Sequence, residues 1–447
     1  MVDPDRPEFH FSPNQWMNDP IPIWANGACH VFFQHNPDGA RWGTMHWGHA
    51  RTTNFGSWEI LPVALSPTPS GWDAAGCWTG SVVKHDDRYC AIYTGIPSMV
   101  DPDRPRQVQG LATSVDLIAW EKYFPALVEE PPLPIGACFR DPCVFQREGV
   151  WWMVVGSEDP RGAGGLALLY HSLDLQRWEF RSVLCRGHQA LTGRDFECPD
   201  FFELNHQWIF LSSRGYTFWQ TGALDEERYA FHPGHWGIMD SAVFYAGKTA
   251  LAPDGRRILF GWLKERRSAS QQRESGWSGV LALPRLLQVS DSGRVLQQPL
   301  EELRGLRQRP TAIGALQIVN APGEQQRWQL IEEMEGPAAE VELEIQADCA
   351  SFGLYFSSSM PQAIRLDVLI NLQQGLLDGR HHLFKQDGTV YLDVFIDHSV
   401  VEVFVDRCSV VSGRVTAARI EDHPLSVWVA GGMLSIRQGT VWQIHAG

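Results

Sequence analysis

One short phrase recurs three times in the first half of the chain, and it constrains the fold more than any other feature. It reads NFGSWE at residues 54–59, DLIAWE at 116–121 and DLQRWE at 174–179, so successive tryptophans lie 62 and 58 residues apart. Between these copies, short apolar or alternating runs end at Gly, Asp, Asn or Pro, which is typical of β-strands joined by turns. A repeat of this length in an all-β chain predicts propeller blades, each a four-stranded sheet.

A second phrase interleaves with the first and gives the number of blades. In this second pattern, a small or acidic residue stands at the start of an apolar strand. A turn and a second strand that contains aromatic residues follow it. The phrase runs from Asp19 to Phe33, Ser81 to Tyr93, Asp141 to Val155, Asp200 to Leu211 and Asp240 to Trp262. We therefore predict a five-bladed β-propeller. Because the first strand of each blade lines the central channel, we expect residues at these starts to converge on one pocket.

The repeat stops near residues 279–287, and the pattern then changes. Residues 299–310 lack strand alternation and end in proline, which favours a helix or a linker. Alternating runs resume at residues 339–345, 351–356, 389–396 and 400–405, which predicts a β-sandwich. The predicted organisation is all-β, with the propeller at residues 1–297, a linker at 298–312 and a C-terminal β-sandwich at 313–447.

Charge and cysteine content narrow the possible partners and compartment. A formal net charge of −15 argues against nucleic acid, whose binding needs a basic face. We expect no membrane partner either, because no apolar run approaches the length of a span. Nine scattered cysteines without a CxxC pair indicate reduced, mostly buried thiols. The first residues show neither a basic nor an apolar leader region, so we expect a cytoplasmic protein without a signal peptide.

Three acidic motifs stand at three of the predicted strand starts: Asn18-Asp19-Pro20, Arg140-Asp141-Pro142 and Glu197-Cys198-Pro199-Asp200. Proline keeps the preceding residue out of the helical region, which predicts extended or turn backbone at Asp19. In a propeller, Asp19, Asp141 and Glu197 would point into one funnel. Their mutual repulsion would raise the pKa of at least one unless a cation offsets it. We expect Arg140 to keep Asp141 ionised, which leaves Glu197 as the candidate protonated acid.

One ionised carboxylate and one protonated carboxylic acid are what cleavage of a glycosidic bond requires. A separation of about 5–5.5 Å gives a covalent intermediate with retention, and about 6.5–9.5 Å leaves room for water and gives inversion. The alternative to a catalytic role is a structural one, in which acidic side chains at strand ends cap turns. Turn capping readily accounts for a single acid at a strand start, but less readily for three. His232 and His235 have a zinc-like interval but no adjoining Cys/His set. We expect no metal and no cofactor.

The motifs resemble, in order and spacing, the three acidic boxes of glycoside hydrolase family 32, the β-fructofuranosidases. Residues 32–37, 47–50, 78–81, 277–279, 283–285 and 396–404 are similar to further segments of that family. The chain also departs from the family pattern. Ile21-Pro22 stands where Asn-Gly usually follows the first box, Trp78-Thr79 replaces Phe-Ser, and Val243 stands where Asp is common. We expect these departures to affect the leaving-group side and the choice of substrate.

The resemblance implies a propeller that carries catalysis, followed by a β-sandwich. It implies a retaining glycoside hydrolase that releases terminal β-D-fructofuranosyl units from sucrose or fructo-oligosaccharides through a covalent fructosyl-enzyme. Asp19 would be the nucleophile, Glu197 the acid and then the base, and Asp141 would hold fructose hydroxyls and stabilise the transition state. The implied substrate contacts are Asn18, Gln34, Trp42, Trp78, Thr79, Arg140, Tyr245 and Trp262.

Two other functions would use the same residues. A fructosyltransferase, forming oligofructans or a difructose anhydride, differs only in how an acceptor sugar competes with water. A non-catalytic sugar-binding protein is disfavoured because all three acids are present. The C-terminal region shows no catalytic group, and we expect it to be structural, covering part of the propeller or mediating dimerisation. A monomer and a homodimer both fit this expectation.

Overall fold

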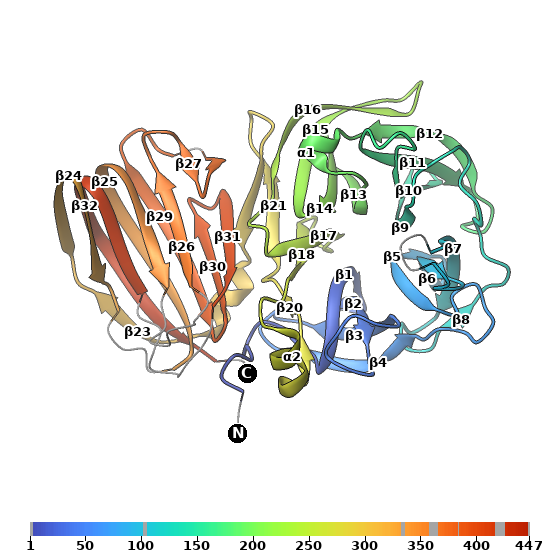
Figure 1. Ribbon diagram of the computed structural model, residues 1–447, viewed down its shortest axis with the longest axis horizontal. Coiled ribbons are helices and arrows are strands. Elements are labelled where there is room, and N and C mark those ends of the chain that lie inside the picture. Colours follow the sequence, from blue (N-terminus) through green and yellow to red (C-terminus); the bar gives the residue numbers. More distant parts are fainter. Residues whose placement is uncertain are drawn as a thin grey trace.

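The computed structural model describes residues 3–101, 105–331, 336–356, 365–382, 384–415 and 425–445. Five small β-sheets form a ring, and a larger sheet, coloured yellow to red, stands beside it (Figure 1). The predicted fold class, all-β with a five-bladed propeller followed by a C-terminal β-sandwich, is confirmed, and the strands of the predicted sandwich belong to one curled ten-stranded sheet. None of the helices within the described residues is long and apolar enough to cross a membrane.

The first three blades follow one another along the chain, each as four antiparallel strands. Blade one comprises β1 (Gln15–Ala25), β2 (Ala28–Asn36), β3 (His46–Thr52) and β4 (Glu59–Leu65). Blade two comprises β5 (Gly76–His85), β6 (Arg88–Ile96), β7 (Val108–Ser114) and β8 (Glu121–Lys122). Blade three comprises β9 (Phe139–Arg147), β10 (Val150–Glu158), β11 (Gly165–Ser172) and β12 (Glu179–Arg186). The innermost strands are β1, β5 and β9, as the repeat predicts.

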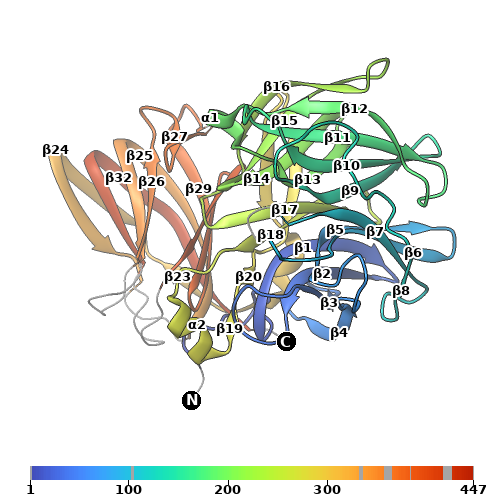
Figure 2. The same ribbon diagram turned by 45° about the vertical axis from the view of Figure 1, so that its right-hand side comes forward.

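Blades four and five complete the ring. Blade four follows the short helix α1 (Gln189–Thr192) and comprises β13 (Glu197–Leu204), β14 (Gln207–Arg214), β15 (Tyr216–Asp225) and β16 (Ala230–Ile238). Blade five comprises β17 (Phe244–Leu251), β18 (Arg257–Leu263), β20 (Val280–Leu281), β21 (Arg285–Val289) and β22 (Val295–Pro299), with α2 (Ala269–Ser275) inserted after β18. Next to α2, β19 (Trp277–Ser278) pairs in parallel with β1 and closes the ring between the last blade and the first (Figure 2).

The recurring phrase is the turn from the third to the fourth strand of a blade. In blade three, Asp174 Oδ1 accepts hydrogen bonds from the backbone N–H groups of Gln176 and Arg177, at 2.9 and 2.8 Å. Asp116 and Asn54 bind the equivalent backbone groups in blades two and one. An aspartate or asparagine oxygen that replaces a backbone acceptor stabilises this kind of turn. The repeat in the sequence is therefore a repeat of turn chemistry.

The C-terminal strands form one ten-stranded sheet that curls around its own core. Its strands are β23 (Arg307–Ile313), β24 (Leu316–Gln329), β25 (Ala338–Phe356), β26 (Leu366–Asn371), β27 (Leu376–Leu377), β28 (Arg380–His381), β29 (Thr389–Asp397), β30 (Val400–Val405), β31 (Ser409–Arg414) and β32 (Leu425–Ile444). In β25, buried Val341, Leu343 and Ile345 alternate with Glu342 and Glu344. This period of two places one face of the strand in the core.

The segment between the propeller and the C-terminal sheet is short and ordered. It contains the 3-10 helix η1 (Glu301–Leu306), which leads directly into β23, and β23 pairs with β32 at the C-terminal end of the chain. The larger sheet therefore begins inside the stretch that the sequence assigns to a linker. A shared hydrophobic cluster joins the two parts, with Phe9 and Phe11 from the N-terminal segment and Phe395 and Phe404 from the C-terminal sheet.

Candidate active site

The three acidic motifs form β-bulges at the starts of three inner strands. Breaks in strand register interrupt β1, β9 and β13 at these motifs. Asp19, Asp141 and Cys198, each followed by proline, have φ angles of 41°, 62° and 48°. The structure thus differs from the predicted extended or turn backbone, because a residue before proline ordinarily avoids this left-handed region. Such strain is held in place by the surrounding sheet, and a bulge redirects the side chain it carries.

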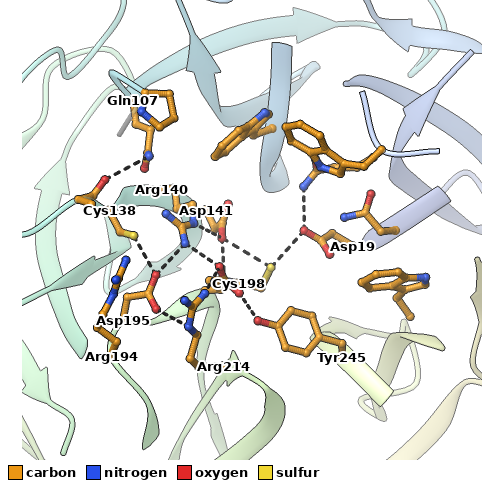
Figure 3. Close-up of a pocket in the computed structure, with 18 of the residues that line it drawn as sticks. Asp19, Gln107, Cys138, Arg140, Asp141, Arg194, Asp195, Cys198, Arg214 and Tyr245 are labelled. Atoms are coloured by element: carbon orange, nitrogen blue, oxygen red, sulfur yellow. Dashed lines mark hydrogen bonds and ion pairs between the residues drawn. The ribbon is translucent and has the colours of Figure 1, made fainter. Parts of the chain in front are cut away.

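The bulges bring all three carboxyl groups into one cavity of about 380 Å³. Figure 3 shows Asp19 and Asp141 on either side of Cys198, with Tyr245 and Arg214 below them in this view. The residues named from the sequence that line this cavity are Asn18, Asp19, Gln34, Trp42, Trp78, Arg140, Asp141, Glu197, Tyr245 and Trp262. Thr79 does not line it. That side chain is fully buried and reaches the cavity only through its hydrogen bond to Asp19.

Asp19 is held by hydrogen-bond donors from β2 and β5. Gln34 Nε2 lies 2.7 Å and Thr79 Oγ1 lies 2.8 Å from Asp19 Oδ2, and Gln34 also donates to Thr79. Burial raises the pKa of Asp19. The hydrogen bond from Thr79 acts against this rise, and the nearby charge of Glu197 adds to it. The result is a carboxyl group of fixed orientation whose pKa lies above its usual range.

Asp141 is more deeply buried than Asp19 and Glu197, the other two acids predicted from the sequence. The backbone N–H of Cys198 donates to Asp141 Oδ2 at 2.9 Å. Burial raises the pKa of Asp141 to about 6, although the charge of Arg140 acts to lower it. Arg140 Nε lies 3.8 Å from Asp141 Oδ2. The expectation that Arg140 keeps Asp141 ionised is therefore met only in part, because burial has the larger effect.

Glu197 is contacted by two arginines and a tyrosine. Arg140 Nη2 lies 2.6 Å and Arg214 Nη1 lies 2.9 Å from Glu197 Oε1, and the Tyr245 hydroxyl donates to Oε2. The guanidinium of Arg140 is thus closer to Glu197 than to Asp141, its neighbour in the sequence. Three donors from different strands fix the position of the Glu197 carboxylate.

A fourth acid, Asp195, completes an ion-pair network behind Glu197. Asp195 is fully buried, with Oδ2 at 2.8 Å from Arg140 Nη2 and Oδ1 at 2.9 Å from Arg214 Nε. The remaining arginine of the cavity, Arg194, lies 3.1 Å from the carboxylate of Glu158. Each of the three arginines that line the cavity is thus paired with a carboxylate of the protein.

Aromatic rings flank the carboxyl groups. The ring centroids of Trp16 and Trp262 are 5.9 Å apart, and those of Trp262 and Tyr245 are 6.2 Å apart. On the other side Trp42, which is 48% exposed, lies 6.2 Å from Trp78. Indole and phenol rings offer apolar faces on which the C–H face of a sugar can stack. The cavity thus combines flat apolar walls with a polar floor.

Several lining residues are not identified from the sequence. They are Trp16, Pro105, Gln107, Ala137, Cys138, Arg194, Asp195, Cys198 and Arg214. Cys198 stands inside the third acidic motif, Trp16 precedes the first motif by two residues, and Asp195 precedes Glu197 by two residues, so the motifs and their flanking residues predict these three. Arg214, at the end of β14, carries no local signal. Only the folded sheet brings it to Glu197.

The unusual Ile21-Pro22 lies away from this cavity. Both residues line a separate cavity to which all five inner strands contribute, and Pro22 pairs with Val31 in the regular ladder between β1 and β2. The expectation that this departure alters the leaving-group side therefore has no support in the geometry.

Carboxyl groups gathered in one cavity, with aromatic walls, can cleave a glycosidic bond by acid–base or nucleophilic chemistry. Within the part of the chain that the structure describes, no group of three or more His, Cys, Asp or Glu side chains could hold a metal ion. All nine cysteines are free thiols, and seven of them are buried.

Comparison with known proteins agrees with this chemistry. The family model "Glycosyl hydrolases family 32 N-terminal domain" matches residues 10–299, and "Glycosyl hydrolases family 32 C terminal" matches residues 302–443. A sucrose-6-phosphate hydrolase of Escherichia coli is 35% identical over 98% of this chain and 94% of its own length. A raffinose invertase of Escherichia coli is 34% identical over 98% of this chain and 95% of its own length.

Solved structures show the same architecture. A β-fructofuranosidase of Bombyx mori, also solved as a mutant with sucrose, has a TM-score of 0.81 at 29% identity and covers 99% of this chain and 94% of its own. Fructan 1-exohydrolase IIa of Cichorium intybus has a TM-score of 0.84 at 24% identity, which shows the fold alone. The matches span both parts of the chain, and the predicted family is confirmed: the chain belongs to glycoside hydrolase family 32.

Proposed function

We propose that this glycoside hydrolase releases terminal β-D-fructofuranosyl units from sucrose or short fructo-oligosaccharides by double displacement, with retention. The observation that carries the proposal is the convergence of Asp19, Asp141 and Glu197 in one cavity of about 380 Å³ with aromatic walls. That volume lies within the range of small-molecule sites, about 300–1,000 Å³. The relatives named as sucrose-6-phosphate hydrolase, raffinose invertase and β-fructofuranosidase support the substrate class.

Asp19 is the proposed nucleophile. Its carboxylate attacks the anomeric carbon of the fructosyl unit, and the bond to the leaving oxygen breaks as the bond to Asp19 forms. Gln34 and Thr79, both bound to Oδ2, keep the carboxylate from rotating away from the attack direction. Proximity and orientation of this kind supply much of the rate acceleration in such reactions.

Glu197 is the proposed acid and base. It gives its proton to the leaving oxygen in the first step, and takes a proton from the incoming water in the second. Arg140, Arg214 and Tyr245 hold the carboxyl group at one place through both steps. Asp141 binds hydroxyl groups of the fructosyl ring and stabilises the positive charge that develops on it.

The charges around the cavity favour a substrate without a phosphate group. A bound phosphate needs cationic or N–H donors that are not already satisfied. The three arginines of the cavity are paired with Asp195, Glu197 and Glu158, at distances of 2.6 to 3.1 Å. We therefore propose sucrose over sucrose 6-phosphate, although one of the E. coli relatives carries the phosphate in its name.

The test is an assay of fructose release from sucrose, sucrose 6-phosphate, raffinose and inulin. Asp19→Ala and Glu197→Ala should each lower kcat by several orders of magnitude, because residues that act as a unit fail together. Glu179→Gln, which removes an exposed carboxylate of β12, is the matched control and should keep wild-type activity. Full activity in either cavity variant would refute the proposal, and a preference for sucrose 6-phosphate would refute its substrate.

Two further measurements separate the alternatives. NMR of the first product should give β-fructofuranose, since retention preserves the configuration, whereas inversion would give the α anomer. Oligofructans or a difructose anhydride as the main product at high sucrose concentration would identify a transferase. Sucrose binding without any turnover would identify a sugar-binding protein.

We also propose an oligomeric state and a compartment for this enzyme. The chain would act as a monomer or a homodimer, and light scattering would distinguish the two. Nine free thiols, one of them beside Asp19, suit a reducing compartment such as the cytoplasm.

A further inference from the structure

Two arginines are shared between Glu197 and a second carboxylate, that of Asp195. Arg140 Nη2 lies 2.6 Å from Glu197 Oε1 and 2.8 Å from Asp195 Oδ2, so one nitrogen atom contacts both acids. Arg214 uses two nitrogen atoms, with Nη1 2.9 Å from Glu197 Oε1 and Nε 2.9 Å from Asp195 Oδ1. Figure 3 shows Asp195 linked to both arginines. We call these four residues the acid–arginine cluster.

Asp195 is enclosed, whereas Glu197 is open to the cavity. Asp195 stands in the cavity wall, but its side chain has no exposed surface, while that of Glu197 is 20% exposed. Asp195 Oδ2 also accepts a hydrogen bond from the Cys138 thiol at 2.8 Å, and the Asp195 backbone forms an isolated β-bridge with Glu158 of β10. A substrate in the cavity therefore meets Glu197 directly and Asp195 only through the arginines.

Both arginines of the cluster stay charged. Burial acts to lower the pKa of Arg140, but nearby negative charges, with Glu197 first among them and Asp195 included, outweigh it and raise the pKa above its usual range. The same two carboxylates raise the pKa of Arg214 against the effect of burial. Two guanidinium charges in contact with one carboxylate favour its ionised form. The acid step proposed for Glu197, however, needs the protonated form.

We propose that Asp195 is a positioning residue for this acid step, an inference that rests on the proposed role of Glu197 as acid and base. When Glu197 is protonated, Asp195 remains as the counter-charge of Arg140, whose side chain is only 12% exposed. The charge of Asp195 also disfavours the ionised form of Glu197, which helps Glu197 to retain its proton. Arg140 and Arg214 thus stay in place and bind Glu197 again when it gives the proton up.

Asp141 does not replace Asp195 in this role. Asp141 Oδ2 lies 3.8 Å from Arg140 Nε, a longer distance than either contact of Arg140 Nη2 within the cluster. Among the described residues, the carboxylates within 4.0 Å of Arg214 are those of Asp195 and Glu197. Asp195 is therefore the carboxylate that remains on both arginines when Glu197 is neutral.

Three further groups face Glu197, from β1, β17 and the segment after β18. The hydroxyl of Tyr245 in β17 donates to Glu197 Oε2 and carries no charge. Asp19 of β1 and Lys264, which follows β18, interact with Glu197 through their charges. These two charges have opposite signs and oppose each other. The charge balance at Glu197 thus depends chiefly on Asp195 and the two arginines.

The test compares the pH dependence of kcat/KM for sucrose in the wild type and in Asp195→Asn. Asparagine keeps the shape of the side chain without its charge, so Glu197 should lose its proton at lower pH. We expect the alkaline limb of the profile to move to lower pH by about one pH unit or more. We also expect kcat near pH 7 to fall roughly tenfold to a hundredfold, since general acid catalysis contributes about 10²–10⁴-fold.

Asp240→Asn is the matched control. It removes a carboxylate that is as buried as Asp195 and that also pairs with an arginine, Arg285, 2.7 Å away and outside the cavity. This variant should leave the alkaline limb in place, whatever its effect on stability. A limb that moves equally in Asp240→Asn and Asp195→Asn would overturn the inference, because loss of any buried ion pair would then explain the change.

Arg214→Gln tests the same balance from the opposite side and does not depend on whether Asp195→Asn folds. It removes one positive charge from Glu197, so the alkaline limb should move to higher pH. In Asp195→Asn/Arg214→Gln, which loses one charge of each sign, the limb should return toward that of the wild type. A limb that moves to lower pH in Arg214→Gln would overturn the inference.

A p-nitrophenyl β-fructofuranoside separates the acid step from binding. Nitrophenolate leaves without a proton, so Asp195→Asn should lose much less kcat/KM with this substrate than with sucrose. An unmoved limb in Asp195→Asn, or a rise in KM alone, would overturn the inference even while the wild type releases fructose. An alkaline limb that persists in Glu197→Ala would instead show that Glu197 is not the acid, and would refute the proposed function itself.

Discussion

The imidazole of His10 and the carboxylate of Asp397 form a buried pair, with Nδ1 2.9 Å from Oδ2. Asp397 also accepts hydrogen bonds from the backbone N–H groups of Glu8, Phe9 and His10, at 2.7, 3.0 and 2.8 Å. The end of β29 in the C-terminal sheet thus holds the N-terminal segment that runs directly into β1 and Asp19. This gives the segment at residues 396–404 a specific structural role at the junction of the two parts.

The junction should depend strongly on His10. Its Nε2 lies 3.1 Å from Glu402 Oε1, so His10→Gln would leave two fully buried carboxylates with a weaker partner. Breaking a buried ion pair from one side costs about 3–5 kcal/mol. We expect a loss of this order in the free energy of unfolding, measured by urea titration. His232→Gln, at an exposed histidine, is the control and should change it by less than about 0.5 kcal/mol.

The same contacts predict how stability changes with pH. Burial lowers the pKa of His10, but the hydrogen bonds and charges of Asp397 and Glu402 outweigh it, so the net pKa is raised. The folded state therefore binds more protons above pH 6.5, and the stability that His10 contributes is full below that pH and declines as pH rises through the folded pKa. The difference in unfolding free energy between wild type and His10→Gln should shrink accordingly. A difference that grows above pH 6.5 would contradict this.

The decline of the unfolding free energy at low pH has a different cause. Burial raises the pKa of Glu402, but the charge of Arg285 and the hydrogen bond from His10 act more strongly and lower it to about 2. A carboxylate with a depressed pKa contributes stability above its unfolded value of about 4.5, and that contribution is lost as pH falls toward 2. We expect Glu402→Gln to flatten the decline in unfolding free energy between pH 5 and pH 2.

The sequence predicts those parts of the fold that local chemistry repeats. The motif Asp/Asn-x-x-x-Trp marks the outer turns of blades one to three. Blade four has the same turn, but the motif is not recognisable there because Tyr229 stands in place of the tryptophan. There, Asp225 Oδ1 still accepts from the backbone N–H groups of Glu227 and Arg228, both at 3.0 Å. A sequence search for the Asp or Asn that accepts these two hydrogen bonds, instead of for the tryptophan, would have found the turn of blade four.

Other parts of the site could not be predicted from local sequence. The left-handed φ at Asp19, Asp141 and Cys198 opposes the preference of a residue before proline, so only the strand ladders on either side impose it. The ion pairs of Asp195 with Arg140 and Arg214 join blades three and four. Contacts of this kind are set by tertiary packing and leave no periodic signal along the chain.

Tyr245 should matter for catalysis through its hydroxyl alone. The hydroxyl donates to Glu197 Oε2, and burial, followed by the charge of Glu197, raises the pKa of Tyr245 so that it stays a donor. A hydrogen bond to a charged group contributes about 1.5–3 kcal/mol. We therefore expect Tyr245→Phe to lower kcat/KM roughly ten- to hundredfold with the fold intact. Tyr123→Phe, at an exposed ring, should have no effect, and an equal loss in both would contradict a specific role.

Asp141→Asn should separate stability from activity. Burial raises the pKa of Asp141 to about 6, from 3.8 for the free side chain. An acid whose folded pKa is raised makes the folded state less stable as pH rises from 3.8 to 6, and the loss stays constant above pH 6. Asparagine keeps the acceptor for the Cys198 N–H without the charge. The variant should therefore gain up to about 3 kcal/mol relative to wild type at pH 8, and nothing at pH 3.5.

Activity should change in the opposite direction, because a neutral amide cannot stabilise positive charge on the fructosyl ring. We expect kcat of Asp141→Asn to fall by at least about a hundredfold, and the low-pH limb of wild-type kcat/KM near pH 6 to disappear from any residual activity. Asp291→Asn, which removes an exposed carboxylate, should change neither quantity. Equal destabilisation of Asp141→Asn at pH 8 and pH 3.5 would show that the buried charge is already balanced in the folded enzyme. A stabilised and inactive variant would instead show that the enzyme keeps this unfavourable charge for catalysis.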